Sequence, residues 1–335
     1  MIVKNQNLKF DSLIKKKNLR KILFTPGPSS LLKENIENIN PAFGRGDKDY
    51  LKLEKKVLSK IKKMSGHKNI ITTQGAGTTV LEMVSLNFLK GSVLIISTGY
   101  YSDRLFNLSL MAKKTHKHIK KITKVSWQNL DSIKSNYDWI WACYTETSMG
   151  IKQSMLDLKK LSKKTKSKLA VDATASFGLE ENHKLADVVS FSSCKGLFGL
   201  TGAGFVCYKL EPKNKVNSYV LNIKNAKEKK MTGPYHAMQS LELVLENYKS
   251  FKKSVITNKK LALKKFKKFL IYPIKNQPLL CTYLNCKIKA TSPKVILYKP
   301  RIKLYGSVIC HLGEIHLAEK AKGKILDYLK TDAQT

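Results

Sequence analysis

Short apolar runs alternate with stretches of helical spacing along most of this 335-residue chain. The apolar runs are typical of buried strands and occur at residues 70–71, 93–96, 139–142, 169–171, 188–191 and 204–207. Between them, apolar positions recur at helical spacing at residues 51–64, 80–84, 105–111 and 155–164. Strands that alternate with helices predict an α/β fold with a largely parallel sheet and helices on both faces.

The two ends of the chain depart from this alternation. Residues 1–20 read as an N-terminal arm, and the turn-rich segment at 23–28 follows it. Helical spacing returns at 241–245 and 261–270. We therefore predict three parts, listed here in chain order: an arm at 1–20, a large domain at 21–254 and a small C-terminal α/β domain at 255–335.

Composition favours a large enzyme-like protein over a membrane protein. With 42% hydrophobic residues the chain can bury a large core. No apolar run is long enough to span a bilayer, and the basic segment at 1–20 lacks the apolar core of a signal peptide. Six cysteines in a chain of this length suggest free thiols in a reducing compartment, so we expect a cytoplasmic protein.

Two of these cysteines invite a second interpretation. Cys281 and Cys286, together with His311, could form half of a metal site. Their spacing and the lack of a second pair favour structural cysteines instead. We expect no metal.

The formal net charge of +38 could indicate a nucleic-acid partner. The charge is almost entirely lysine and is spread along the chain, and no nucleic-acid-binding module accompanies it. Solvated helix faces explain such a pattern, so we expect no specific nucleic-acid binding. The positive field could still attract an acidic substrate.

Two residues carry the candidate chemistry. Lys195 lies in a segment rich in glycine, serine and threonine at 192–205, and Asp172 ends the apolar run at 169–171. Enzymes that use pyridoxal 5′-phosphate (PLP) need one lysine to hold the cofactor as an aldimine and one carboxylate to keep its ring nitrogen protonated. Small residues around the lysine let the backbone approach a flat cofactor closely.

Six motifs in a fixed order make this interpretation specific. They are Thr25-Pro26-Gly27-Pro28 and the segments 74–78, 99–104, 146–150, 171–178 and 192–205. Together they resemble the class V, fold type I PLP-dependent aminotransferases, above all the 2-aminoethylphosphonate–pyruvate transaminase branch and more distantly the serine/alanine–glyoxylate aminotransferases. The resemblance runs from about Leu23 to Tyr208 and thins after about Val255. It implies the fold type I architecture, with a large domain around a mostly parallel sheet, a shortened C-terminal domain, and a role in phosphonate metabolism.

The resemblance also implies where the phosphate of PLP would bind. Gly75, Ala76, Gly77 and Thr78 follow a predicted strand and open a helix, where backbone N–H groups favour a phosphate. A turn of small residues can also be merely structural. Cys194 takes the place of the Asn or Gln that is common before the lysine. Thr232, in Met231-Thr232-Gly233-Pro234, would reach the neighbour's phosphate in a homodimer with shared active sites.

Four residues are assigned to the ring by the same resemblance. Tyr101 would stack on the ring, with Tyr100 as the competitor that could simply pack on the core. Thr147 would donate a hydrogen bond to the phenolic oxygen, and Asp172 would face the ring nitrogen, although an aspartate at a strand end can also cap a helix. Lys195 would hold PLP and then move a proton between the substrate Cα and C4′ of the cofactor.

The sequence departs from the family where the substrate's acid group is clamped. Val308 stands where the family carries an arginine, whose two-pronged pairing no other side chain makes well. Arg45 and Arg301 are the candidate replacements.

The predicted function is transfer of an amino group between a small amine, of the 2-aminoethylphosphonate kind, and an oxo acid or aldehyde. One alternative is a PLP-dependent lyase or decarboxylase on the same scaffold. The other is a non-catalytic homologue, which the valine at position 308 makes credible.

Overall fold

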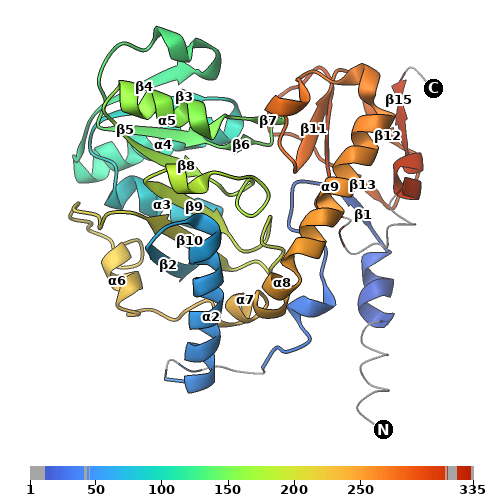
Figure 1. The fold of residues 1–335 in the computed structure, drawn as a ribbon, viewed down its shortest axis with the longest axis horizontal. Coiled ribbons are helices and arrows are strands. Elements are labelled where there is room, and N and C mark those ends of the chain that lie inside the picture. Colours follow the sequence, from blue (N-terminus) through green and yellow to red (C-terminus); the bar gives the residue numbers. More distant parts are fainter. Residues whose placement is uncertain (1–11, 41–43, 45, 314, 316–322, 333–335) are drawn as a thin grey trace.

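A computed structural model describes residues 12–40, 44, 46–313, 315 and 323–332. A central sheet lies between two layers of helices, and a smaller C-terminal layer packs beside it (Figure 1). This arrangement is the predicted α/β architecture.

The central sheet has seven strands in the order β2-β10-β9-β8-β5-β3-β4. Their bounds are β2 (Asn69–Gln74), β10 (Ala203–Tyr208), β9 (Val188–Ser192), β8 (Lys168–Asp172), β5 (Trp139–Cys143), β3 (Gly91–Ser97) and β4 (Ile119–Ser126). Strand β10 runs antiparallel to both of its neighbours, and all other pairs are parallel. The prediction of a largely parallel sheet is confirmed. Strand β4, an edge strand rich in lysine, was not predicted, because it lacks an apolar run.

Helices cover both faces of this sheet. They are α2 (Lys48–Ser65), α3 (Gly77–Asn87), α4 (Tyr100–His116), α5 (Met155–Lys164), α6 (Ile223–Lys227), α7 (Tyr235–Gln239) and α8 (Glu242–Glu246). Helix α2 begins where the Asp47 side chain accepts hydrogen bonds from two backbone N–H groups, and ends at Gly66 in the left-handed conformation. These caps extend the predicted helix at 51–64 by a few residues at its start.

Alternate residues of the buried strands enter two separate cores. Leu94 and Ile96 of β3 pack on the face covered by α2 and α5. Val93 and Ile95 pack on the opposite face, with side chains of α3 and α4. Successive side chains of a strand point to opposite faces, so a strand buried on both faces reads as the continuous apolar run seen in the sequence.

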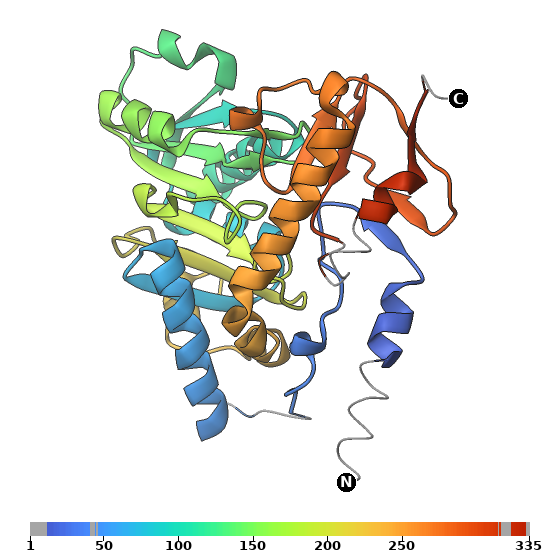
Figure 2. The same cartoon turned by 45° about the vertical axis from the view of Figure 1, so that its right-hand side comes forward.

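The C-terminal layer is built from the long helix α9 (Tyr248–Lys265) and short paired strands (Figure 2). The pairs are β11 (Cys281–Leu284) with β14 (Ser307–Cys310), β12 (Ile288–Ala290) with β15 (Leu329–Thr331), and β1 (Ile22–Phe24) with β13 (Val295–Leu297). Strand β1 thus joins the start of the chain to this layer, and α9 crosses the predicted boundary at 254/255. The division into an arm and two domains stays a prediction.

Within the described residues no helix is both long and apolar enough to cross a membrane. Six short 3-10 helices complete the fold of these residues, at Lys33–Asn35, Trp127–Ser132, His183–Leu185, Lys267–Phe269, Ile274–Asn276 and Leu326–Tyr328.

Candidate active site

A cavity of about 350 Å³ opens at the carboxyl ends of the parallel strands β5 and β8, the edge at which α/β sheets usually bind ligands. Its walls come from six segments of the chain. They are formed by Ala76, Gly77, Thr78, Leu81, Tyr101, Arg104, Cys143, Thr145, Thr147, Asp172, Thr174, Ala175, Ser192, Cys194, Lys195 and Arg301. Residues separated by more than 200 positions in the sequence therefore meet in one site.

Lys195 faces Tyr101 across this cavity. The Lys195 Nζ lies 5.8 Å from the centroid of the Tyr101 ring. Gly27, with φ of +127°, makes room for the lysine on its other side, since a Cβ there would lie 3.1 Å from the Lys195 Cγ. The Thr25–Pro28 motif therefore lets the lysine stem approach the backbone closely.

Asp172 is a buried carboxylate that accepts hydrogen bonds through one of its two oxygens. Thr174 donates to Asp172 Oδ1 from its backbone N–H at 2.9 Å and from its hydroxyl at 2.5 Å, and no other described residue hydrogen-bonds this carboxylate. Burial raises the pKa of Asp172, and the Thr174 hydrogen bonds and then the charges of Lys195 and Arg104 oppose that rise. A cationic partner in the cavity would stabilise the ionised carboxylate.

Two buried hydroxyls at the cavity wall lack a well-formed hydrogen bond to any described residue. They are Thr145 Oγ1 and Thr147 Oγ1, carried by the turn after β5. The Tyr298 hydroxyl lies near Thr147 and Tyr101, and its pKa is raised above the ordinary range, mainly by burial. Buried hydroxyls in a native fold are usually paired, so a ligand with a hydrogen-bonding group fits this wall.

The turn from β2 into α3 forms the opposite end of the cavity. Ala76, Gly77 and Thr78 line the cavity there, at the N-terminus of an eleven-residue helix. Gly75 is absent from the wall. It has φ of +144°, and a Cβ on it would lie 2.5 Å from the Thr79 hydroxyl, so its place in the turn requires glycine. A direct contact from Gly75 to a cofactor stays a prediction.

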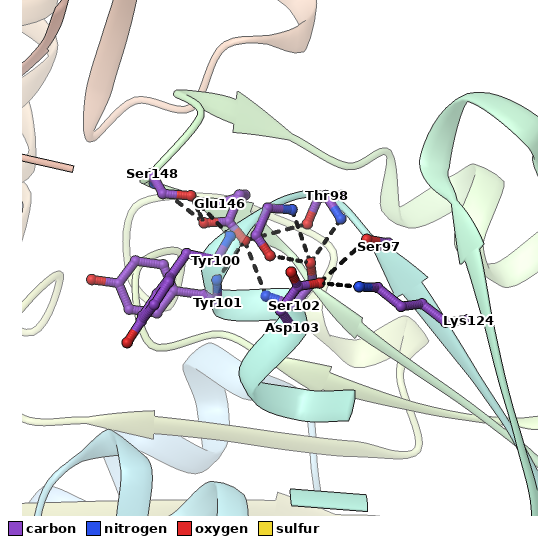
Figure 3. A network of polar contacts seen from close by, with 10 residues as sticks. Ser97, Thr98, Tyr100, Tyr101, Ser102, Asp103, Lys124, Glu146 and Ser148 are labelled. Carbon is purple, nitrogen blue, oxygen red and sulfur yellow. Dashed lines mark hydrogen bonds and ion pairs between the residues drawn. The ribbon is translucent and has the colours of Figure 1, made fainter. Parts of the chain in front are cut away.

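Glu146 holds the N-terminus of α4, which carries Tyr101, against the turn after β5 (Figure 3). Its Oε2 accepts from the backbone N–H groups of Tyr101 and Ser102, at 3.0 and 3.1 Å. Its Oε1 accepts from the N–H and the hydroxyl of Ser148, at 3.2 and 2.5 Å. Glu146 is fully buried, so it fixes the position of Tyr101 from behind without lining the cavity.

The remaining predicted site residues fall in different places. Arg301 is exposed and lines the cavity. Val308 is buried in β14 opposite Tyr283 and lies away from the cavity. Thr232 is exposed and lines a different cavity, beside Tyr235. Arg45 lies outside the described residues.

Seven residues of the cavity wall were not among the predicted site residues, and four of these seven are charged or carry a hydroxyl. These four are Arg104, Thr145, Thr174 and Ser192. Arg104 ends the motif at 99–104, three residues after Tyr101, and one helical turn places such neighbours on the same face. That spacing could have identified it.

The family model described as aminotransferase class-V matches residues 47–239, which is more than half of the chain. The chain belongs to this family. The match ends before most of the C-terminal layer, so it covers the wall that carries Lys195 and leaves Arg301 outside.

Curated relatives support the same placement at low identity. The 2-aminoethylphosphonate–pyruvate transaminase of Pseudomonas aeruginosa is 25% identical over 198 residues, 55% of this chain and 53% of the relative. The enzyme of the same name from Bacillus cytotoxicus is 26% identical over 210 residues, 58% of this chain and 57% of the relative. The chain thus spans only about half the length of the curated relatives it matches.

Solved structures show that the fold extends beyond the sequence match. The ureidoglycine–glyoxylate aminotransferase of Bacillus subtilis has a TM-score of 0.73 at 13% identity, covering 91% of this chain and 92% of its own. An aspartate aminotransferase of subgroup IV from Thermus thermophilus has a TM-score of 0.74 at 18% identity, covering 91% and 99%. The fold is therefore that of the fold type I aminotransferases.

Class V aminotransferases depend on PLP, and the cavity fits this cofactor. A flat ring in the cavity would have an aromatic side chain beside it in Tyr101, the Lys195 amine within reach and the buried Asp172 carboxylate as a partner for its nitrogen. The unpaired hydroxyl of Thr147 suits a phenolic oxygen. The start of α3 suits a phosphate.

Proposed function

We propose that this protein is a PLP-dependent aminotransferase that moves an amino group from a small amine bearing an acid group, of the 2-aminoethylphosphonate kind, to an oxo acid. One observation carries the proposal: Lys195, Tyr101 and the buried Asp172 line a single cavity that also contains the start of α3. The names of the curated relatives support the choice of amine.

Each of these residues has a separate task. PLP, when bound, supplies an electron sink that stabilises the electron pair left on the substrate carbon after a proton is removed. Lys195 would hold the cofactor covalently, and its Nζ would move that proton. Asp172 holds a proton on the ring nitrogen, because a buried carboxylate favours a cation beside it. Tyr101 orients the ring and excludes water from one of its faces.

The phosphate and the phenolic oxygen would be bound by groups that are otherwise free. Backbone N–H groups at Ala76, Gly77 and Thr78 begin α3 and face the cavity. Thr147 would donate its hydroxyl hydrogen to the phenolic oxygen. Cys194, which also lines the cavity, adds at most a weak donor where the family has an amide.

We propose a homodimer in which Thr232 reaches the phosphate of the neighbouring site. Ala76 and Thr78 are exposed in the single chain, and so is Thr232, which lies outside its own chain's cavity. A second copy that brings Thr232 to the start of α3 would cover these residues.

We propose a cytoplasmic location on the basis of thiol chemistry. All six cysteines are free, and four of them are buried in the fold. Free thiols persist in reducing compartments.

An amino-transfer assay tests the function. Protein loaded with PLP is mixed with 2-aminoethylphosphonate and pyruvate, and alanine and phosphonoacetaldehyde are quantified by mass spectrometry. We expect both products in equal amounts, and a fall of at least about 10³-fold in rate in Lys195→Ala, which loses both the covalent link and the base. The matched control is Lys303→Ala, because Lys303 is exposed and lies outside the cavity.

Two results would contradict the proposal. One is an aldehyde or carbon dioxide formed without alanine, which would point to a lyase or decarboxylase. The other is no turnover of any amine in a panel of acidic and neutral compounds, which would point to a non-catalytic homologue.

A further inference from the structure

Two arginines from distant parts of the chain meet at Tyr100, at the mouth of the cavity. Arg104 belongs to α4, one turn after Tyr100, and Arg301 belongs to the loop between β13 and β14. The Arg104 guanidinium lies 5.6 Å from the centre of the Tyr100 ring, and the Arg301 guanidinium lies 5.5 Å from it. Both arginines also line the cavity that contains Lys195.

The two guanidinium groups share one neutral acceptor. Arg301 donates from Nη1 to the Tyr100 hydroxyl at 3.2 Å. Hydrogen bonds from Arg301, and then from Arg104, lower the pKa of Tyr100. A phenol oxygen is a weak partner for two cations, so this corner of the cavity favours an anion.

Neither arginine is neutralised by a carboxylate. Among the described residues, ion pairs with Asp or Glu are made by lysines, and none involves Arg104 or Arg301. The Arg104 guanidinium also lies 5.0 Å from the centre of the Tyr101 ring, and its Nη1 donates to the Thr78 hydroxyl at 3.0 Å. Arg104 therefore lies between the start of α3 and Tyr100, while Arg301 lies on the side of the C-terminal layer.

Among the described residues, Arg301 is the arginine that the C-terminal layer brings to the cavity, where it can replace the missing acid clamp. Val308 is buried opposite Tyr283 and does not line the cavity. Arg301 comes from the loop that precedes the same strand, so a cation still enters the cavity from the C-terminal layer, from a different position in the chain.

We propose that Arg301 and Arg104, which both contact Tyr100, bind the acid group of the substrate, and that this group is a tetrahedral dianion such as a phosphonate or phosphate. This inference rests on the proposed function. A carboxylate has two oxygens and is saturated by one guanidinium fork, whereas a phosphonate offers three oxygens and a second negative charge to two forks. The Tyr100 hydroxyl then donates to the anion in place of accepting from Arg301.

Binding without turnover tests this site. Ethylphosphonate carries the acid group but no amine, and propionate is its carboxylate counterpart. Affinities of the PLP-loaded protein for both are measured by calorimetry in the wild type, Arg301→Ala, Arg301→Lys, Arg104→Gln and the control Lys303→Ala, which removes one charge from the same loop.

We expect the wild type to bind ethylphosphonate more tightly than propionate. Arg301→Ala and Arg104→Gln should each weaken ethylphosphonate binding roughly tenfold or more. Arg301→Lys should recover part of this loss, and Lys303→Ala should leave the affinity within about twofold.

The proposed anion site would be refuted if the wild type and Arg301→Ala bound ethylphosphonate with equal affinity, or if the wild type did not bind it. Propionate binding as tight as ethylphosphonate binding would refute the claim that the acid group is a tetrahedral dianion. Borohydride reduction of each protein reports separately on the cofactor: an unlabelled Lys195 would refute the proposed function, whereas a labelled Lys195 with unchanged anion affinity would refute the site alone.

Discussion

The two ends of the cavity are built in different ways. The proposed cofactor end consists of strand ends of the large sheet and of the starts of α3 and α4. The proposed substrate end depends on Arg301, on a loop between short strands of the C-terminal layer. The difference teaches that the proposed cofactor end is held by the large sheet and the helices packed on it, whereas the proposed acid-binding cation comes from a loop, whose position along the chain is less constrained.

The largest expected effect distinguishes the cofactor end of the cavity from the substrate end by which amines each substitution slows. Asp172→Asn removes the carboxylate that holds a proton on the ring nitrogen, so amino transfer should fall by about 10²–10⁴-fold for acidic and neutral amines alike. Arg301→Ala should instead slow acidic amines alone. Rates with a matched pair, 2-aminoethylphosphonate and propylamine, check this.

Asp157→Asn is the control for Asp172→Asn, because Asp157 is exposed in the first turn of α5. A selective loss of acidic amines in Asp172→Asn, or an equal loss of both amines in Arg301→Ala, would remove the distinction between the two ends.

A smaller effect concerns the support behind the cofactor end. Glu146→Ala should reduce the free energy of unfolding by about 2 kcal/mol or more, because it leaves the buried N–H groups that start α4 without their acceptor. Denaturant unfolding measures this, and cofactor affinity should fall together with stability because Tyr101 loses its anchor. Glu37→Ala, at an exposed position, is the control. Full stability in Glu146→Ala would show that α4 is held by packing alone.

The smallest effect concerns the C-terminal layer. Lys259 of α9 is buried and donates to Gln277, Cys281 and Thr282, at 2.8, 2.8 and 2.7 Å. Burial lowers the pKa of Lys259 from 10.5 to about 8. Between these values the unfolded chain binds more protons than the folded one, so this group adds stability as pH rises from 8 toward 10.5.

The wild type should therefore gain roughly 1 kcal/mol of stability per pH unit relative to Lys259→Met over this window. Denaturant midpoints at pH 8, 9 and 10 measure the difference. A difference that stays constant, or that shrinks with rising pH, would show that Lys259 keeps an ordinary pKa in the fold.

The sequence predicted the large sheet well because its strands are buried on both faces. Continuous apolar runs such as 93–96 and 139–142 stand out from the surrounding helices. Strand β4 was not predicted because its lysines face solvent at a sheet edge. The short strands of the C-terminal layer were not predicted because three or four residues are too few to show a periodic pattern of apolar positions.

The residues of the candidate site also divide into those that the sequence could predict and those that it could not. Lys195, Asp172 and Tyr101 could be assigned because each lies in a motif next to a strand. The pairing of Arg104 with Arg301 could not, since it joins positions 197 residues apart through a loop whose path depends on packing. The role of Glu146 was hidden because most of its partners are backbone N–H groups, which no side-chain pattern reveals.

The most direct test of the central claim is the position of the cofactor on the chain. Purified protein is incubated with PLP, reduced with borohydride, digested and mapped by mass spectrometry. We expect one pyridoxyl group, on the peptide that contains Lys195, and no label there in Lys195→Ala. A label on another of the chain's many lysines, or no label at all, would contradict the assignment of this cavity as the active site.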